Sequence, residues 1–366
     1  MRVVIVHDIS QVFGGSERVL IALLRMYPHA DIYVGFLSNV SRQLLGRYTD
    51  GVIIASPYNH APFASSYPDI YKPFLLFWWR SLNVSHYDLV IASSHSYSSK
   101  SVRPPKNVPH VAYIHTPPRY LWGVYNESQW IHRWPFRWFL SPFLRWMRQV
   151  DTQSAKRPKV LIANSQVVKE RIQKFYHRGS TVVYPPVHLP TRTLPRTPHY
   201  YLCVSRLVKQ KGVDIAIEAC NALHASLVIV GSGKEERALK RIAGPSVRFL
   251  GFVPDEQMAR VYAGARAFLY LSREEDFGLS PVEAMAHGIP VIASSDGGAA
   301  ETVVHGKTGL LIPTVNLLSV MRAMRELESL SFSPSTCRKQ AAKFSESVFR
   351  KHMRAIISSV TRNSHG

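Results

Sequence analysis

The chain has 366 residues, of which 46% are hydrophobic and 19% are charged, and its formal net charge is +21. This length and apolar content exclude an intrinsically disordered chain and predict two domains rather than one. So large a positive charge indicates an anionic partner, namely nucleic acid, an anionic membrane surface or a phosphorylated substrate, unless it only reflects solvated basic faces of an enzyme.

The first expected element is a β-branched run at residues 2–6, which is typical of a buried parallel strand. Gly14 and Gly15 follow, and then comes an apolar pattern of helical spacing, for which Ser16 is the expected N-cap. A strand, a glycine loop and a helix in this order are typical of the start of a doubly wound α/β domain.

Three further strands are expected in the first half, and each of them ends in polar residues. They lie at residues 89–92, 111–114 and 160–163, and the last two are followed by His115 and Asn164. Because the carboxyl ends of parallel strands line the ligand crevice, both side chains are predicted to lie where binding sites are built.

A proline-rich segment at residues 184–200 has the composition of a linker, and a second strand–helix series follows it. We expect strands at 201–204, 227–230, 267–270 and 291–293 and a helix at 213–223. The expected fold class is therefore α/β, with two Rossmann-like doubly wound domains that face a cleft. The expected domains are residues 1–188 and 189–344, with a C-terminal helix at about 345–366 that packs back on the first domain.

The three cysteines, Cys203, Cys220 and Cys337, are scattered and form no C-x-x-C, so neither a disulfide framework nor a zinc knuckle is expected. The N-terminal apolar run is too short for a secretory signal, and no apolar run reaches the roughly 18 residues of a membrane span. We therefore expect a cytoplasmic protein that is soluble or lies on a membrane surface.

Several familiar motifs are incomplete in this chain. Gly231-Ser232-Gly233 lacks the third glycine of a dinucleotide fingerprint, because position 236 is Glu236. Gly306-Lys307-Thr308 lacks the first glycine of a P-loop. There is no D-x-D pair and no cluster with metal-ligand spacing, so neither a metal nor a cofactor is expected.

The stretch from residue 272 to 291 carries two carboxylates eight residues apart, Glu275 and Glu283. Between them, Phe277-Gly278-Leu279 forms a glycine loop before a helix expected to begin near Ser280 or Pro281. The free N–H groups of a helix N-terminus suit a diphosphate, and carboxylates suit sugar hydroxyls. The alternative is an ordinary helix start with acidic residues that favour the dipole.

A second constellation lies at residues 204–212, where Ser205, Arg206 and Lys211 follow the expected strand. Arg206 and Lys211 can neutralise the charge that builds up on a departing nucleotide diphosphate. The alternative is a pair of solvated basic residues in a turn.

Together these segments resemble glycosyltransferase family 4. Glu275 and Glu283 match its E-x7-E signature, and residues 204–212 are similar to its S-R-L-x-x-x-K-G segment. Gly14-Gly15 resembles its first glycine loop, whereas residues 113–122 and 183–187 resemble segments of the bacterial O-antigen and exopolysaccharide mannosyltransferases. Asp276 departs from the pattern, since glycine is more usual there.

This resemblance implies a GT-B fold and retaining, metal-independent transfer of a hexose from a nucleotide diphosphate sugar. It favours mannose from GDP-mannose, with a UDP-sugar as the alternative, and a lipid-linked saccharide acceptor in cell-surface polysaccharide synthesis. It implies an acceptor role for the first domain and a donor role for the second. The implied catalytic residues are His115, Glu275, Arg206 and Lys211. The implied donor-binding residues are Gly14, Gly15, Ser205, Arg206, Lys211, Gly231, Glu275, Phe277, Gly278, Leu279 and Glu283.

Residues 130–148 interleave tryptophan with arginine, as an interfacial membrane segment does. Pro135 and Pro142 are expected to interrupt a single long helix, and residues 71–80 could add a second patch. Packing of the tryptophans inside the N-terminal domain is the open alternative. The expected membrane contacts, on the inner face of the plasma membrane, are Trp130, Arg133, Trp134, Arg137 and Trp138.

Two other functions fit parts of these observations. A basic nucleic-acid-binding protein would explain the charge and the aromatic stretches, but the chain lacks a zinc finger and an RNP motif. A related fold could also carry out other chemistry, such as that of a sugar-nucleotide epimerase or a phosphorylase.

Overall fold

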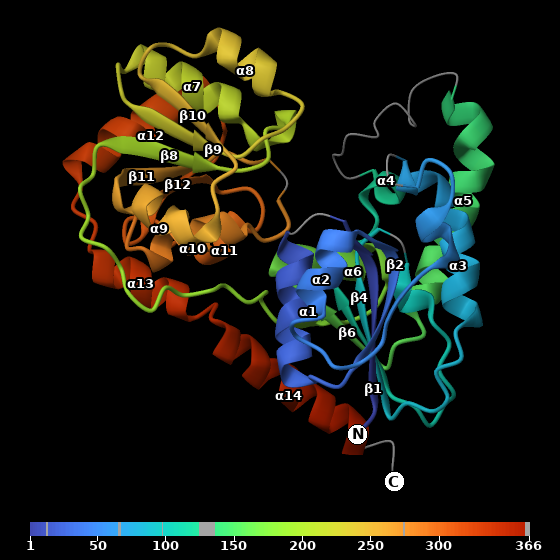
Figure 1. The fold of residues 1–366 in the computed structure, drawn as a ribbon. Coiled ribbons are helices and arrows are strands. Elements are labelled where there is room, and N and C mark those ends of the chain that lie inside the picture. The colour runs from blue at the N-terminus through green and yellow to red at the C-terminus, as the bar shows by residue number, and fades with distance from the viewer. Residues whose placement is uncertain (12–13, 65–66, 97, 124–135, 274, 363–366) are drawn as a thin grey trace. The chain divides into compact units, whose positions relative to one another are not determined.

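The computed structural model describes residues 1–11, 14–64, 67–96, 98–123, 136–273 and 275–362, with the backbone alone at 136–139. Contacts divide the chain into two compact units, shown in Figure 1. Unit 1 comprises Met1–Pro186 and Glu346–Gly366, and unit 2 comprises Val187–Ser345. Each unit is a parallel sheet covered by helices, so the predicted fold class of two Rossmann-like domains is confirmed.

The sheet of unit 1 is parallel in every pair of neighbouring strands, in the order β3-β2-β1-β4-β5-β6-β7. Its strands are β1 (Val3–Ser10), β2 (Asp31–Leu37), β3 (Ile53–Ala55), β4 (Leu89–Ser94), β5 (His110–Ile114), β6 (Val160–Ala163) and β7 (Thr181–Val182).

Alternate residues of the central strands pack into two hydrophobic cores, one on each face of this sheet. Val3 and Ile5 of β1 pack into the core that contains the buried residues of the first and last helices. Val4 and Val6 pack into the core that contains Leu75, Trp79 and the apolar face of residues 168–176. A strand buried on both faces is apolar wherever its side chains have no polar partner, which is why most of each strand is a continuous run of apolar residues.

The helices of unit 1 cover both faces of the sheet (Figure 1). They are α1 (Gly15–Met26), α2 (Asn39–Leu45), α3 (Lys72–Ser81), α4 (Arg119–Trp122), α5 (Phe136–Ala155), α6 (Gln166–Tyr176) and α14 (Glu346–Arg362), with the 3₁₀ turns η1 (Pro57–His60), η2 (Pro68–Tyr71) and η3 (Ser99–Ser101).

Unit 2 repeats the architecture with strand order β10-β9-β8-β11-β12-β13, again parallel throughout. Its strands are β8 (Tyr200–Val204), β9 (Leu227–Val230), β10 (Val247–Gly251), β11 (Ala265–Tyr270), β12 (Val291–Ser294) and β13 (Gly309–Ile312). Its helices are α7 (Val213–Ala222), α8 (Glu236–Ile242), α9 (Asp255–Ala263), α10 (Leu279–Ala286), α11 (Ala299–Thr302), α12 (Leu317–Ser329) and α13 (Pro334–Ala342), with the 3₁₀ turn η5 (Lys209–Lys211).

The strands expected from the sequence are all present, but two local predictions are wrong. Helix α1 begins at Gly15, so its N-cap is Gly14 and not Ser16. The carboxylate of Glu17, the third residue of the helix, accepts a hydrogen bond from the N–H of the N-cap Gly14 at 2.9 Å, as the acidic residue of a capping box does. Helix α5 runs through Pro142 instead of stopping there. The proline removes one backbone hydrogen bond, and the packing of the rest of the helix outweighs this cost.

A buried ion pair fixes α5 to the rest of unit 1. The Lys100 ammonium on η3 pairs with the Asp151 carboxylate on α5, and both side chains are 1% exposed. The indole N–H of Trp122 donates a hydrogen bond to the same carboxylate at 3.0 Å. Two charges this deeply buried are tolerated only when each is paired, so the arrangement of η3, α4 and α5 is strongly specified.

Helix α14, the last element of the chain, completes the core on one face of the unit 1 sheet. It buries Phe349, Met353, Ile357 and Val360 there. The ring of Phe349 packs edge to face on Tyr113 of β5, with ring centres 5.9 Å apart.

This packing leads to a prediction for the variant Phe349→Ala. All seven tryptophans lie at or before Trp146, so tryptophan fluorescence reports the unfolding of unit 1. Removing a buried phenylalanine leaves a cavity, and we expect the free energy of unfolding, measured by urea titration, to fall by about 3–5 kcal/mol. The exposed neighbour Lys351 serves as control, and Lys351→Ala should leave the transition in place. A fluorescence transition insensitive to Phe349→Ala would contradict the role of α14.

Candidate functional site

The predicted donor residues of unit 2 follow the carboxyl ends of three neighbouring strands, β8, β9 and β11. Strand β8 lies between β9 and β11, so the chain leaves it toward one side of the sheet and returns on the other. This reversal is the position where parallel α/β sheets bind ligands. The loops that begin there contain residues 205–211, 231–233 and 271–278.

Two glycines allow the first two loops to pack backbone on backbone. Gly231 has φ +124°, and a Cβ built on it would lie 1.9 Å from the carbonyl oxygen of Ser205. A Cβ on Gly233 would lie 2.3 Å from the carbonyl oxygen of Leu207. Only glycine fits at such distances, so the G-x-G after β9 serves here to hold the loop that carries Arg206 and Lys211.

Lys211 and Glu275 form an ion pair, although they are far apart in the sequence. Their side chains are 13% and 25% exposed, and the hydroxyl of Ser272 donates a second hydrogen bond to the Glu275 carboxylate at 2.9 Å. The Lys211 ammonium also lies 5.9 Å from the centre of the Tyr270 ring. Burial, together with the nearby Glu275 carboxylate, raises the pKa of the Tyr270 hydroxyl well above its ordinary value, so this tyrosine stays neutral.

The segment before α10 is held by a second glycine pair, Gly297 and Gly298. The N–H of Gly298 donates to the carbonyl oxygen of Glu275 at 2.9 Å, and a Cβ on Gly298 would lie 2.3 Å from the Phe277 Cα. Phe277 is buried, and Gly278, at φ +82°, turns the chain into α10. Helix α10 thus begins at Leu279, one or two residues before the start expected at Ser280 or Pro281, with its first N–H groups at this edge of the sheet.

The remaining predicted donor residues are less tightly placed. Arg206 directly follows Ser205 after β8 and is exposed. Glu283 lies on α10, where the Tyr262 hydroxyl is 3.5 Å from its carboxylate, and the Tyr262 ring stacks on His287. The structure therefore brings Lys211 and Glu275 into direct contact, whereas Arg206 and Glu283 lie on the flanking loop and helix.

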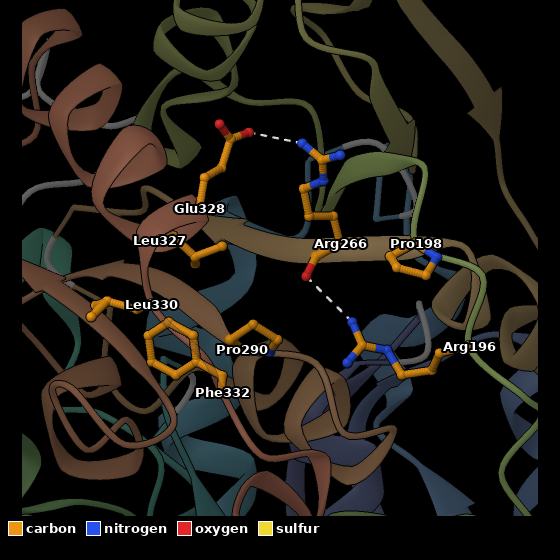
Figure 2. A pocket seen from close by; sticks show the side chains of 8 residues that line it. All are labelled: Arg196, Pro198, Arg266, Pro290, Leu327, Glu328, Leu330 and Phe332. Carbon is orange, nitrogen blue, oxygen red and sulfur yellow. Dashed lines mark hydrogen bonds and ion pairs between the residues drawn. The ribbon is translucent and has the colours of Figure 1, made fainter.

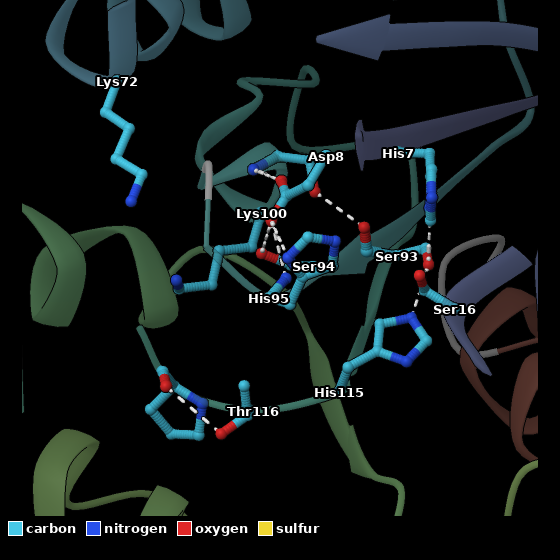
Figure 3. A network of polar contacts seen from close by, with 12 residues as sticks. His7, Asp8, Ser16, Lys72, Ser93, Ser94, His95, Lys100, His115 and Thr116 are labelled. Carbon is cyan, nitrogen blue, oxygen red and sulfur yellow. Dashed lines mark hydrogen bonds and ion pairs between the residues drawn. The ribbon is translucent and has the colours of Figure 1, made fainter. Parts of the chain in front are cut away.

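The candidate residues of unit 1 lie at the equivalent reversal, between β1 and β4. His115 directly follows β5, and its Nε2 is 2.8 Å from the hydroxyl oxygen of Ser93 at the end of β4 (Figure 3). The same oxygen is 2.9 Å from Nδ1 of His7 on β1. Gly14 and Gly15 begin α1, the next element after β1.

Burial lowers the pKa of His115 well below its ordinary value, and the neighbouring rings of His95 and His7 lower it further. His115 is therefore a neutral imidazole at neutral pH. A neutral ring has one nitrogen that donates and one that accepts, which suits it to hydrogen-bond a hydroxyl rather than to bind an anion.

Sequence reasoning missed most of the polar groups around His115. Asp8 accepts hydrogen bonds from the backbone N–H groups of His95 and Ser99, both at 2.6 Å, and so fixes the loop after β4. His7 and Asp8 are 0% exposed and lie inside β1, which continues beyond the expected strand at residues 2–6. In the sequence, the sign of these buried polar groups was that His7 and Asp8 directly follow the apolar strand expected at residues 2–6.

The expected membrane contacts lie mainly outside the part of the chain that the structure describes. Trp130, Arg133 and Trp134 are beyond it, and only the backbone of Arg137 and Trp138 is covered. Along the described part of α5, Phe143 and Trp146 are 42% and 38% exposed.

A pocket of about 440 Å³ opens elsewhere in unit 2 (Figure 2). Pro198, Arg266 and Pro290 on its wall precede or begin β8, β11 and β12, so it lies at the amino ends of these strands. The residues predicted for donor binding follow the carboxyl ends, at the opposite edge of the sheet. The pocket is therefore separate from the candidate donor site.

The described residues contain no group of histidine, cysteine, aspartate and glutamate side chains arranged to hold a metal ion. Among them, too, no helix is long and apolar enough to cross a membrane.

Comparison with known families covers nearly the whole chain. Residues 13–191 match the family described as Glycosyltransferase Family 4, and residues 190–344 match Glycosyl transferases group 1. The chain belongs to glycosyltransferase family 4.

Relatives of this family 4 protein act on different sugars. It is 36% identical over 143 residues to a GDP-mannose-dependent alpha-(1-6)-phosphatidylinositol monomannoside mannosyltransferase of Mycobacterium tuberculosis. The aligned stretch covers 34% of this chain and 37% of that protein. It is 33% identical over 137 residues to the D-rhamnosyltransferase WbpZ of Pseudomonas aeruginosa, and this aligned stretch covers 36% of each protein. The matched stretch thus spans little more than a third of either relative.

The fold of this family 4 protein is that of solved glycosyltransferase structures. Anabaena Alr3699/HepE in complex with UDP and glucose superimposes with a TM-score of 0.73 and 20% identity, over 98% of this chain and 100% of that one. The predicted GT-B fold is therefore confirmed.

Proposed function

We propose that this glycosyltransferase transfers mannose from GDP-mannose to a lipid-linked saccharide, with retention of configuration and without a metal, in cell-surface polysaccharide synthesis. The observation that carries the proposal is the Lys211–Glu275 ion pair beside the N-terminus of α10. A cation, a carboxylate and free helix N–H groups at one strand edge are the groups that an activated sugar requires.

The pair exchanges partners when the donor binds. An incoming diphosphate carries more negative charge than one carboxylate, so it takes over the Lys211 ammonium, with Arg206 and the N–H groups after Gly278 as further donors. Glu275 is then released to accept a hydrogen bond from a hydroxyl of the sugar. Stabilisation of the departing diphosphate supplies the main catalytic effect.

The other predicted site residues have supporting roles in this proposal. Glu283 binds the ribose, and His115, as a neutral imidazole, contacts a hydroxyl of the transferred sugar. The glycine loop at Gly14 and Gly15 meets the donor phosphates. Ser205, Gly231, Phe277 and Leu279 shape the loops around the donor, as their close packing supports.

The acceptor side of the proposal is a membrane-bound substrate, reached from the inner face of the plasma membrane by a cytoplasmic enzyme. Support comes from exposed apolar side chains on η2 and α3, where Ile70, Phe74 and Phe77 are 59%, 50% and 57% exposed. Helices α3 and α5 both pack on η3, and α5 exposes Trp146. Exposed aromatic rings on a chain of net charge +21 favour an anionic lipid surface.

The first prediction of this proposal concerns Lys211→Ala. Loss of the ammonium removes charge stabilisation from the leaving diphosphate, and we expect kcat for sugar transfer to fall by about 10²- to 10³-fold. The measurement is release of nucleoside diphosphate together with labelled sugar in product. Lys209→Ala, two residues away on the same 3₁₀ turn and exposed, should retain wild-type turnover. Equal turnover in Lys211→Ala and wild type would rule out the assignment.

The second prediction concerns the donor and the metal. Because ligand binding to the folded state stabilises it, GDP-mannose should raise the thermal midpoint of the protein more than UDP-glucose or ADP-glucose does. Transfer from GDP-mannose should continue in EDTA. A shift with UDP-glucose alone would favour a UDP-sugar donor instead, and a loss of activity restored by Mn²⁺ would contradict the metal-free mechanism.

The third prediction concerns vesicle binding. Replacing Phe74 and Phe77 by serine removes two exposed rings, and we expect co-sedimentation with phosphatidylglycerol vesicles to weaken about tenfold or more. Wild-type binding should also weaken with salt, since surface electrostatics are screened. Leu318→Ser in unit 2, at an apolar residue that is even more exposed, is the control. Binding of the double variant at the wild-type level would contradict a membrane role for α3.

A further inference from the structure

Four buried side chains form a continuous chain of contacts that ends at His115. The Glu17 carboxylate lies 3.7 Å from Nε2 of His7, Nδ1 of His7 is 2.9 Å from the Ser93 hydroxyl oxygen, and that oxygen is 2.8 Å from Nε2 of His115. His7 and Ser93 are 0% exposed, Glu17 4% and His115 9%. Figure 3 shows the central part of this chain, with Ser93 between the two imidazole rings.

The serine couples the two rings because its hydroxyl has a single proton. Ser93 must donate that proton to one imidazole nitrogen and accept a hydrogen bond from the other. If it donates to His7, the proton of His115 is on Nε2. If it accepts from His7, Nε2 of His115 is the acceptor and the proton of His115 is on Nδ1.

Glu17 decides between these two arrangements. Burial raises the pKa of its carboxyl, but the nearby His7 ring and the backbone N–H groups around the carboxylate outweigh this, so that the pKa lies below its ordinary value. Its Oε2 accepts hydrogen bonds from the Gly14 N–H at 2.9 Å and the Ser16 hydroxyl at 3.0 Å. Oε1 faces His7, and a carboxylate there favours the tautomer with the proton on Nε2.

We propose that Glu17, His7 and Ser93 are positioning residues that hold His115 with its proton on Nε2 and a lone pair on Nδ1. Within the described residues, Nδ1 of His115 makes no hydrogen bond, so that lone pair is left for a ligand. His115 thus accepts a hydrogen bond from a sugar hydroxyl rather than donating one. This last step rests on the proposed function, whereas the tautomer itself does not.

Long-range ¹H–¹⁵N NMR of the full chain labelled with ¹⁵N-histidine reads the tautomer directly, with His115→Gln to assign the signal. We expect Nε2–H for His115 in the wild type and a mixture with Nδ1–H in Ser93→Ala and in Glu17→Gln. Ser93→Thr keeps the hydroxyl and should restore the wild-type signal. Ser94→Ala, which removes the neighbouring buried hydroxyl, should leave it unchanged.

Two results would overturn the proposal: a wild-type His115 with its proton on Nδ1, or an unchanged tautomer in both Ser93→Ala and Glu17→Gln. If Ser93→Ala does not fold by circular dichroism, Glu17→Gln alone decides, because it is isosteric and keeps an acceptor for Gly14.

Kinetics give the second readout. We expect Ser93→Ala to lower kcat about tenfold with a smaller change in KM, and to cost nothing further in the His115→Gln background. If the variants change the tautomer of His115 but the wild type transfers sugar from no donor, the proposed function is wrong and the positioning role of Glu17, His7 and Ser93 stands. If the wild type transfers sugar but the variants leave the tautomer unchanged, only the positioning role is wrong.

Discussion

The reversal of strand order within each parallel sheet is the constraint on which the rest of this structure depends. On either side of the reversal, between β1 and β4 and between β8 and β11, the chain leaves the sheet toward opposite faces. Helices that diverge in this way leave the intervening strand ends uncovered, so polar groups can be placed there without breaking the sheet. Lys211 follows β8, directly at the reversal of unit 2, whereas His115 follows β5, one strand beyond the reversal of unit 1, and contacts Ser93 at the end of β4.

The loops at these edges carry polar side chains because their backbones are packed as tightly as a core. Gly231 and Gly298 bring neighbouring loop backbones closer than any Cβ would permit. In unit 1 the same rigidity comes from side chains, since the Asp8 carboxylate accepts two backbone N–H groups of the loop after β4. A charged or polar group held in a fixed, partly dry site interacts more strongly with a ligand than a mobile surface group does.

The fold could be predicted from the sequence because buried parallel strands are apolar along their whole length. For the same reason the strand at residues 2–6 was predicted too short: His7 and Asp8 are polar, yet β1 continues to Ser10 because β4 and its loop satisfy them. The individual residues Lys211 and Glu275 were visible as motif positions, but their ion pair was not. Spacing along a chain does not reveal which charges meet across a sheet edge, and Glu17 belonged to no motif at all.

The site charge at Lys211 is compensated by Glu275, and in the proposed mechanism this is how a chain of net charge +21 is selective among anions. Lys211 is paired with Glu275, so an ordinary monovalent anion gains little by displacing a carboxylate already in contact. A diphosphate gains more, because it offers several oxygens and more charge to the same ammonium and to the helix N–H groups beside it. In unit 1 the imidazole of His115 is neutral, so its own ring does not attract anions, and the hydrogen bond that it offers depends on which nitrogen carries the proton. In the proposed mechanism, charge therefore selects the ligand at Lys211, and the position of a single proton selects it at His115.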